Sequence, residues 1–144
     1  LSLHDALPIY VDPSLNSTHG GNPICCAATL ASLEVLQDEN LISESARKGL
    51  LLEKELIKIK NKYEDRIEIF GKGLVYAIHV KKSGTKEYDV EIVDRIIEKS
   101  MQKGVLLIRT GTGTIKIGPP LTIFDDALLE GVSVIDESIS ECFS

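Results

Sequence analysis

Residues 17–28, STHGGNPICCAA, combine a loop hydroxyl, a glycine pair and the start of a helix. Thr18 offers the hydroxyl, and the glycines let the backbone approach a ligand without a Cβ in the way. Asn22 is typical of an N-cap and Pro23 of a first helical residue. A helix N-terminus in this setting is suited to an anion such as a phosphate. The alternative is a capped loop-to-helix junction that binds nothing.

Lys116 is the second residue that could do chemistry, because it is an isolated cation between Ile115 and Ile117. One interpretation is a strand residue on a solvent-facing surface. The other is an anchor for a carboxylate. The sequence leaves both open.

Other candidates are weaker. Residues 110–113 contain Gly-x-Gly without the remaining residues of a nucleotide loop, so we expect a tight connection between strands. His19 and His79 have no ligand-type neighbours at metal spacing, and we predict no metal site. His79 is expected to be a hydrogen-bonded structural histidine. Asp125 and Asp126 are expected to start a helix.

The elements that must position these residues follow from apolar periodicity and from glycine and proline. The expected helices are 23–38, 43–63 (capped by Ser43), 90–103 and 125–142, and the expected strands are 67–70, 74–80, 105–108 and 114–117. The helices are expected to bury Ala46, Leu50, Leu56, Ile59 and Tyr63, then Val93, Ile96, Ile97 and Met101, then Leu128, Val132, Ile135 and Ile139. This order predicts an α+β fold with a small mixed or antiparallel sheet covered by helices.

Composition limits the classes of partner. A chain of 144 residues is long enough for a real core. The net charge of -6, without a dense basic cluster, argues against a nucleic-acid surface. Three cysteines form no disulfide framework, and the most apolar segment is too short to span a membrane, so we expect a cytoplasmic protein without membrane contact.

Residues 1–9, LSLHDALPI, resemble the conceptual translation of a sequencing-adapter oligonucleotide. We therefore expect these residues to be non-native. His4 and Asp5 then have no place in a catalytic site, and the true upstream sequence would be missing.

Three separated motifs carry a family resemblance, in the same order and spacing. They are residues 17–23 with 26–28, then residues 71–74 (GKGL), then residues 115–121 (IKIGPPL). Together they resemble the C-terminal third of a class III pyridoxal-phosphate (PLP) aminotransferase, the group with the acetylornithine, ornithine and 4-aminobutyrate enzymes. The resemblance implies a fold-type I enzyme with an α/β architecture overall. It further implies that residues 10–40 end the cofactor-binding large domain and form an interdomain helix, and that residues 41–144 form the small C-terminal domain.

The resemblance also implies roles for a few residues. The threonine matching Thr18 binds the phosphate of PLP held by the other subunit of a homodimer, and the residue matching Ser17 can lie against the substrate. The position of Lys116 is usually an arginine that grips the substrate α-carboxylate with two parallel hydrogen bonds. Lysine is a point charge without that geometry, so a substrate presented differently is expected here. Phe70 also departs from the family, which often has arginine there.

The implied reaction moves an amino group from an amino acid or ω-amine to a 2-oxo acid. The family's Schiff-base lysine lies upstream of the threonine motif, and residues 10–17 contain no lysine. We therefore expect no catalytic residue in this chain and no activity from it alone. Mutase, racemase or decarboxylase chemistry on the same scaffold stays open. So does a non-enzymatic α+β ligand-binding or regulatory module.

Overall fold

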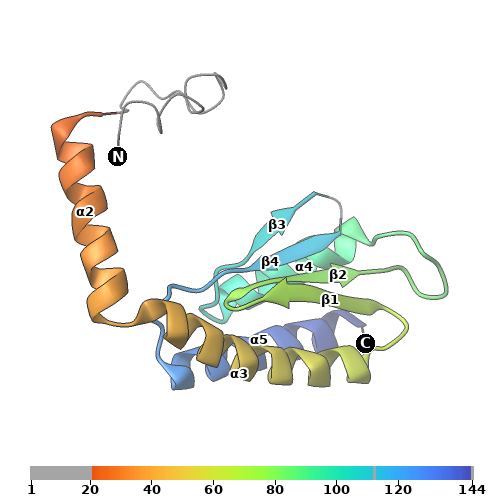
Figure 1. Cartoon of the computed structure of the whole chain (residues 1–144). Helices are drawn as coiled ribbons and strands as arrows, with labels where there is room; N and C mark the ends of the chain where they lie inside the picture. Colours follow the sequence, from red (N-terminus) through yellow and green to blue (C-terminus); the bar gives the residue numbers. More distant parts are fainter. Residues whose placement is uncertain (1–20, 112, 144) are drawn as a thin grey trace. The chain divides into compact units, whose positions relative to one another are not determined.

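A computed structural model describes residues 21–111 and 113–143 of the chain (Figure 1). The elements follow one another as α2 (Pro23–Asp38), α3 (Leu41–Lys62), β1 (Ile67–Lys72), β2 (Val75–Val80), α4 (Val90–Gln102), β3 (Ile108–Thr110), β4 (Thr114–Ile117) and α5 (Asp125–Phe143). This order confirms the α+β prediction made from the sequence.

The chain divides into two compact units, Leu1–Asn40 and Leu41–Ser144. In the first unit, α2 begins as predicted, and none of its residues is buried. Asn40 marks the division with a positive φ of 51°, a conformation that asparagine tolerates better than most residues. The predicted cap at Ser43 is wrong, because Asn40 completes the turn and α3 starts directly at Leu41.

The second unit is built on one antiparallel sheet of four strands in the order β1-β2-β4-β3. The β1–β2 hairpin turns at Gly73, whose φ of 59° suits glycine. β3 and β4 are joined through residues 111–113, where Gly111 and Gly113 have positive φ. The connection predicted at residues 110–113 is therefore confirmed, and of the two expected sheet types the antiparallel one is correct.

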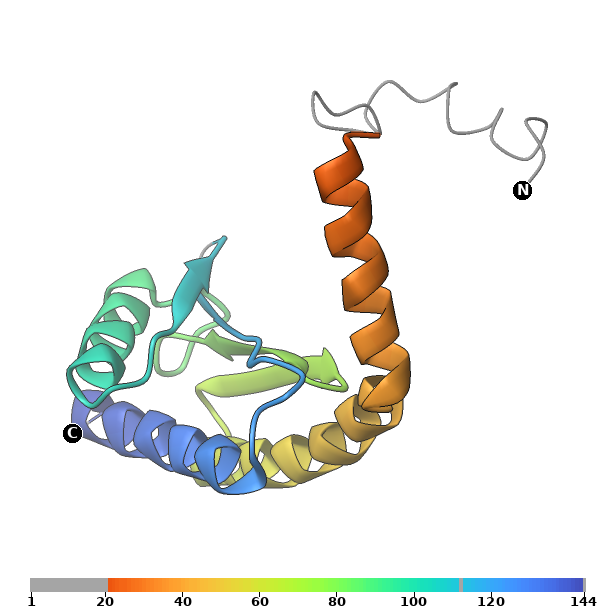
Figure 2. The ribbon, with the colours of Figure 1, turned by 90° about the vertical axis from the view of Figure 1, so that its left-hand side faces the viewer.

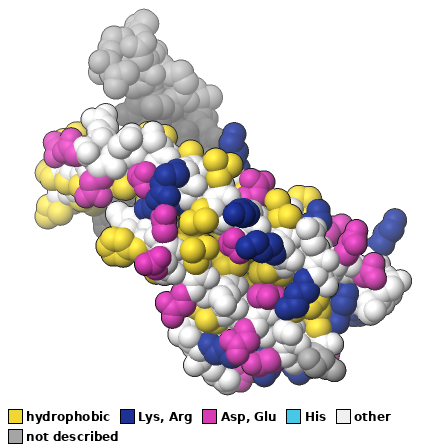
Figure 3. Space-filling model, turned by 90° about the horizontal axis from the view of Figure 1, so that it is seen from below, with side chains coloured by type: hydrophobic (Ala, Val, Ile, Leu, Met, Phe, Trp, Pro, Cys, Tyr) yellow, Lys and Arg dark blue, Asp and Glu magenta, His cyan; other side chains and the backbone are white. Residues whose placement is uncertain are grey.

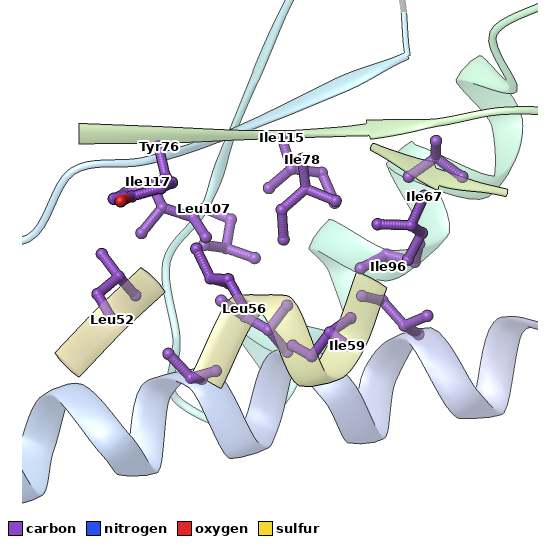
Figure 4. Packing of buried hydrophobic residues seen from close by; sticks show 14 of the residues in the cluster. Leu52, Leu56, Ile59, Ile67, Tyr76, Ile78, Ile96, Leu107, Ile115 and Ile117 are labelled. Carbon is purple, nitrogen blue, oxygen red and sulfur yellow. The ribbon is translucent and has the colours of Figure 1, made fainter. Parts of the chain in front are cut away.

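Helices α3, α4 and α5 pack on one face of this sheet, which we call the inner face (Figure 2). The inward side chains of the strands alternate with outward ones, as the pleat requires. They meet the helices in a single apolar core (Figure 4), whose strand members are Ile67, Tyr76, Ile78, Val80, Ile115 and Ile117. The prediction for α5 is confirmed, because Leu128, Val132, Ile135 and Ile139 are all buried.

Some predicted core positions are wrong. On α3, Ala46 and Leu50 are exposed, whereas Gly49 and Leu52 are buried with Leu56 and Ile59. Residues 50–52 are all leucine, so periodicity alone does not say which of them faces the core. Met101 is likewise exposed, because α4 faces the core through Val93, Ile96 and Ser100.

The third strand was also predicted too early. Residues 105–107 make no sheet ladder, and β3 covers only Ile108–Thr110. Leu107 is buried in the core before the strand starts. The apolar residues at 105–107 therefore indicate packing in the core, through Leu107, and not pairing in a strand.

The opposite, outer face of the sheet carries the outward residues of the same strands. One row across all four strands consists of Phe70, Ala77, Lys116 and Ile108, each paired with the next. Phe70 is 56% exposed and Ile108 60% exposed. This face holds the cation that the sequence singled out.

Candidate functional site

The first motif is only partly described. Ser17 and Thr18, the residues expected near substrate and phosphate, lie outside the described residues, as does His19. The described part begins with Gly21, whose φ is 75°. Asn22 is the N-cap of α2, and its side-chain oxygen accepts a hydrogen bond from the Ile24 amide at 2.9 Å. The predicted cap is therefore confirmed.

This cap affects what the start of α2 can bind. Pro23 has no amide hydrogen, and the Ile24 amide already donates to Asn22. The helix terminus therefore has fewer free donors for an anion than a helix start usually offers. Among the described residues, this end of α2 does not fit a phosphate by itself.

The second motif, GKGL at residues 71–74, has a packing role in the structure. A Cβ on Gly49 of α3 would lie 2.5 Å from the carbonyl oxygen of Gly73, closer than real contacts allow. A Cβ on Gly71 would lie 2.4 Å from the Tyr76 ring. The glycines thus let the hairpin lie directly on α3, and the motif supports the fold without contributing a reactive group.

The third motif ends with a contact to the same helix. The Lys48 ammonium of α3 donates to the Leu121 carbonyl at 3.1 Å and lies 3.9 Å from the Glu44 carboxylate. Lys48 is buried, and its partners satisfy the charge that burial would otherwise penalise. Lys48 and Gly49, adjacent on α3, therefore hold both downstream motifs.

Sequence reasoning missed this pair. The lysine looked like one of many on an amphipathic helix, and the glycine contact joins segments that are distant in the chain. The one available signal was a glycine in the interior of a helix, which usually has a packing reason.

Lys116 itself lies on β4 and is exposed on the outer face. It forms no ion pair with any other residue that the structure describes. Its side chain runs along the end of the strand, with Cε 3.9 Å from the position of a Cβ on Gly118. The structure thus presents an uncompensated cation that a carboxylate can approach.

A groove of about 400 Å³ lies beside Lys116. It is formed between the segment after α4, the turn after β4 and α5, and its lining includes Leu106, Pro119, Ala127 and Gly131. Lys116 is the one ionisable group in that lining. A largely apolar groove with one charged group is the kind of place where small ligands bind.

His79 lies on the outer face, next to Phe70 and Tyr88. Its ring centroid is 5.1 Å from that of Phe70 and 5.4 Å from that of Tyr88. The predicted hydrogen bonding is wrong for one atom, because Nδ1 is buried without a partner. His79 thus belongs to an aromatic cluster, which we define as Phe70, His79 and Tyr88.

The remaining expectations concern metals and membranes. Within the described residues, no group of three or more histidine, cysteine or carboxylate side chains is placed to hold a metal ion. No helix in that part of the chain has the length and apolar character needed to cross a membrane. The three cysteines are free, with Cys25 and Cys26 exposed and Cys142 buried.

Two relatives resemble this chain over most of its length. The mitochondrial acetylornithine aminotransferase of Candida glabrata is 32% identical over 129 residues, which are 89% of this chain and 28% of that protein. Ethanolamine-phosphate phospho-lyase homolog 1 of Caenorhabditis elegans is 35% identical over 128 residues, 86% of this chain and 27% of that protein. The chain therefore spans less than a third of the length of these relatives.

The fold resembles solved transaminases as well. An amine transaminase from an uncultivated Pseudomonas species, in its PLP-bound form, superimposes with a TM-score of 0.79 at 28% identity. The similarity covers 93% of this chain and 31% of that one. The sequence profile of the family "Aminotransferase class-III" matches residues 5–139. The chain belongs to the class III aminotransferase family.

Proposed function

We propose that the chain is the C-terminal part of a PLP-dependent aminotransferase that moves an amino group from an amino acid or ω-amine to a 2-oxo acid. The observation that carries this proposal is the family match across residues 5–139. The chain corresponds to 28% of the acetylornithine aminotransferase and 31% of the amine transaminase, which supports a longer parent protein. In this proposal residues 10–40 complete the large domain and the interdomain helix, residues 41–144 form the small domain, and residues 1–9 are non-native.

PLP, when bound, acts as the electron sink for chemistry at the amino-bearing carbon. The start of α2 has fewer free donors for its phosphate than a helix start usually offers, so we assign that contact to the Thr18 hydroxyl, with Ser17 beside the substrate. A hydroxyl donating to a phosphate is a charge-assisted hydrogen bond, one of the stronger kinds. We further propose a homodimer whose cofactor site is shared between subunits. Three free thiols support a cytoplasmic location.

Lys116 is the residue of this chain that we propose to contact the substrate. It is exposed, it has no ion pair within the described residues, and it borders an apolar groove. These features suit a carboxylate whose apolar portion lies in the groove. The lysine ammonium cannot make the two parallel hydrogen bonds that an arginine guanidinium makes. It therefore attracts the carboxylate by its charge without fixing the plane of the carboxylate.

The first experiment replaces Lys116 in the complete enzyme. Lys116→Met should raise KM for a carboxylate-bearing amino donor by about tenfold or more, since a hydrogen bond to a charged group contributes about 1.5–3 kcal/mol. Lys116→Arg should largely keep the wild-type KM, and KM for an amine without a carboxylate should not change in either variant. Lys72→Met is the matched control, because Lys72 is an exposed lysine on the same face of the sheet, on β1, which β2 separates from β4. An unchanged KM in Lys116→Met would remove Lys116 from the substrate site.

The second experiment tests whether this chain acts alone. The purified chain is mixed with PLP, reduced with borohydride and digested, and the peptides are searched for a PLP–lysine adduct. We expect no adduct at a specific lysine and no transamination, because the Schiff-base lysine lies upstream in the family. A stoichiometric adduct at one lysine would contradict the proposal.

A second candidate function has a specific basis in one relative, which is named a phospho-lyase homolog. A lyase would release ammonia without needing a 2-oxo acid acceptor, so omission of the acceptor separates the two activities. The non-enzymatic module is tested by the genomic sequence upstream of Tyr10. A start codon near Tyr10 would favour the module, and a long continuous frame containing a lysine-bearing strand would favour the enzyme.

A further inference from the structure

A second groove lies between α3 and the β1–β2 hairpin, and Lys116 is not part of its lining. Its volume is about 460 Å³, and all of its lining residues belong to the second unit. The close approach of Gly49 to Gly73 brings the hairpin against the helix at this place. We call it the hairpin groove and define it by Ile42, Ala46, Leu50 and Glu53 of α3 with Gly73 and Tyr76 of the hairpin.

The lining of the hairpin groove includes a polar group without a protein partner. Tyr76 is only 4% exposed, and its ring lies against Gly71. Its hydroxyl makes no hydrogen bond with any residue that the structure describes. Figure 4 shows the hydroxyl oxygen of Tyr76 on the side of the ring that faces away from Ile78 and Ile115. Leaving a buried hydroxyl unpaired is costly, so its partner must come from the groove.

Glu53 supplies an unbalanced negative charge at the same groove. Three acidic residues lie on α3, and two of them, Glu44 and Glu55, form ion pairs within the helix. Glu53 forms no ion pair with the described residues, although acidic and basic side chains lie interspersed over the helical surface (Figure 3). Burial and then the Glu53 charge raise the pKa of the Tyr76 hydroxyl. The two groups are therefore close enough for the charge of one to act on the other.

An exposed apolar stripe leads to Glu53 along the same side of α3. Ile42, Ala46 and Leu50 follow one another at intervals of four residues, and Glu53 is three residues further along. Ile42 is 75% exposed and Leu50 is 70% exposed, and both line the groove. An apolar wall that ends at a single acid suits a small molecule with an alkyl portion and a positive charge.

Lys72, the one basic residue in the lining, does not neutralise Glu53. Lys72 is paired in the sheet with Val75, which is 60% exposed on the outer face. The preceding residue, Gly71, is paired with Tyr76 on the inner face. Side chains alternate between the two faces, so the Lys72 side chain is directed away from the groove. The charge that the groove offers to a ligand is therefore that of Glu53.

We infer that the hairpin groove is a binding site for small alkylammonium ions, the protonated form of an amine with a short alkyl chain. The Glu53 carboxylate accepts hydrogen bonds from the ammonium, and the Tyr76 oxygen accepts another. The alkyl chain covers Ala46 and Leu50. Hydrogen bonds between two charged groups are among the stronger kinds. This site takes the charge opposite to the one that Lys116 attracts, and binding there involves no reaction.

The first test is a titration of the isotope-labelled chain with n-butylammonium chloride, followed by amide NMR signals. Saturable shifts should appear at residues 45–53 and 71–76. Butyrate has a similar alkyl chain with the opposite charge, and ammonium chloride has the charge without the chain. Each should bind at least about tenfold more weakly than n-butylammonium, because each lacks one of the two features that the groove recognises.

Three variants locate the binding. Glu53→Gln should weaken n-butylammonium binding at least about tenfold, because it removes the charged acceptor. Tyr76→Phe keeps the ring and removes the hydroxyl, so it should weaken binding about threefold or more. Glu98→Gln is the matched control, because Glu98 is an exposed acid on α4 outside the groove, without an ion pair among the described residues. Its affinity should stay within about twofold of wild type on the same basis. Circular dichroism confirms that each variant is folded.

The second test asks whether the groove binds the same ion in the complete enzyme, obtained by extending the reading frame upstream. Ala46→Cys places a thiol in the groove, and Ile57→Cys, at a position 44% exposed on the same helix, is the control. Each receives a short pulse of methyl methanethiosulfonate with and without n-butylammonium. Mass spectrometry of the peptides reads the new thiol separately from the three native cysteines. Near saturation the ion should slow labelling at position 46 about fivefold or more by mass action, and leave position 57 unchanged.

Several results would overturn the inference. They are the absence of saturable shifts, equal affinity for butyrate, and unchanged affinity in Glu53→Gln. Labelling at position 46 that n-butylammonium does not slow in the complete enzyme would also contradict it, because the groove would then be filled by another part of the protein or would not hold the ion. Neither test uses catalysis, so binding without transamination contradicts only the proposed function, and transamination without binding contradicts only this inference.

Discussion

The two faces of the sheet are made from alternate residues of the same strands, yet they differ in burial and in what packs against them. Ile78 and Ile115 on the inner face are fully buried against three helices. Phe70, Ala77, Lys116 and Ile108 form a cross-strand row on the outer face that the second unit leaves open. The inner face forms the buried apolar core of the unit, whereas Phe70, Lys116 and Ile108 on the outer face are exposed, so we expect the inner face to contribute more to stability. Outer-face residues that are not part of the buried core are available for an interface and for binding.

The largest expected effect comes from the same substitution made on both faces. Ile78→Ala should lower the free energy of unfolding by about 2–5 kcal/mol, because it leaves a cavity in a closed core. Ile108→Ala should cost under about 1 kcal/mol, mainly through lost strand preference. Urea unfolding of the chain measures both. Equal losses would mean that the outer face is packed and that the contrast between the faces is wrong.

The second prediction concerns how tightly the helical layer approaches the sheet. Gly49→Ala should destabilise the chain by about 1–3 kcal/mol, because its methyl group would collide with the Gly73 backbone and overpacking costs that much. Gly131→Ala on α5 is the control, since a Cβ there meets nothing within 4 Å. It should stabilise the chain by up to about 1 kcal/mol through helix propensity. If the two alanines had the same effect in thermal or urea unfolding, close packing of α3 on the hairpin would be excluded.

The smallest expected effect on stability comes from the exposed side of the helices, where acidic and basic side chains form ion pairs. Hydrogen bonds from Lys103 and then Lys99, at 2.6 and 2.7 Å, lower the pKa of Glu141 from 4.5 to about 2. A lowered pKa in the folded chain gives stability that is present above the unfolded value and is lost as the pH falls from about 4.5 through about 2.

Comparison with Glu141→Gln isolates this contribution. The difference in urea midpoint between wild type and variant should be greatest near neutral pH and should disappear toward pH 2. The pairs are solvent-exposed, so added salt should also shrink the difference. A difference that stayed constant with pH would show that Glu141 acts through packing and not through its charge.

Much of the fold was predictable because it depends on local sequence patterns. The helix starting at Pro23 and the apolar face of α5 follow from a cap and from a clean 3.6-residue period. The strands around residues 67–80 follow from apolar runs broken by glycine. Prediction failed where the pattern was degenerate, as in the three leucines at 50–52, and where an apolar segment packed without pairing, as at 105–107.

The candidate site was predictable only in part, since a lone lysine between two isoleucines is compatible with either a solvent face or a binding role. The structure adds that Lys116 is unpaired among the described residues and borders a groove. Its proposed role as a carboxylate anchor stays a prediction, as do those of Ser17 and Thr18.

The sequence by itself determined the type and order of the secondary elements and the family, because these depend on neighbours in the chain and on motifs in a fixed order. Only the tertiary structure decided that Lys48 and Gly49 hold the GKGL and IKIGPPL segments. Both contacts join residues that are distant in the chain. Gly49 lets the α3 backbone lie close to Gly73, and the buried Lys48 ammonium donates to the Leu121 carbonyl. It also decided which face of the sheet stays open, because a strand's alternation gives two faces without saying which one the helices will cover.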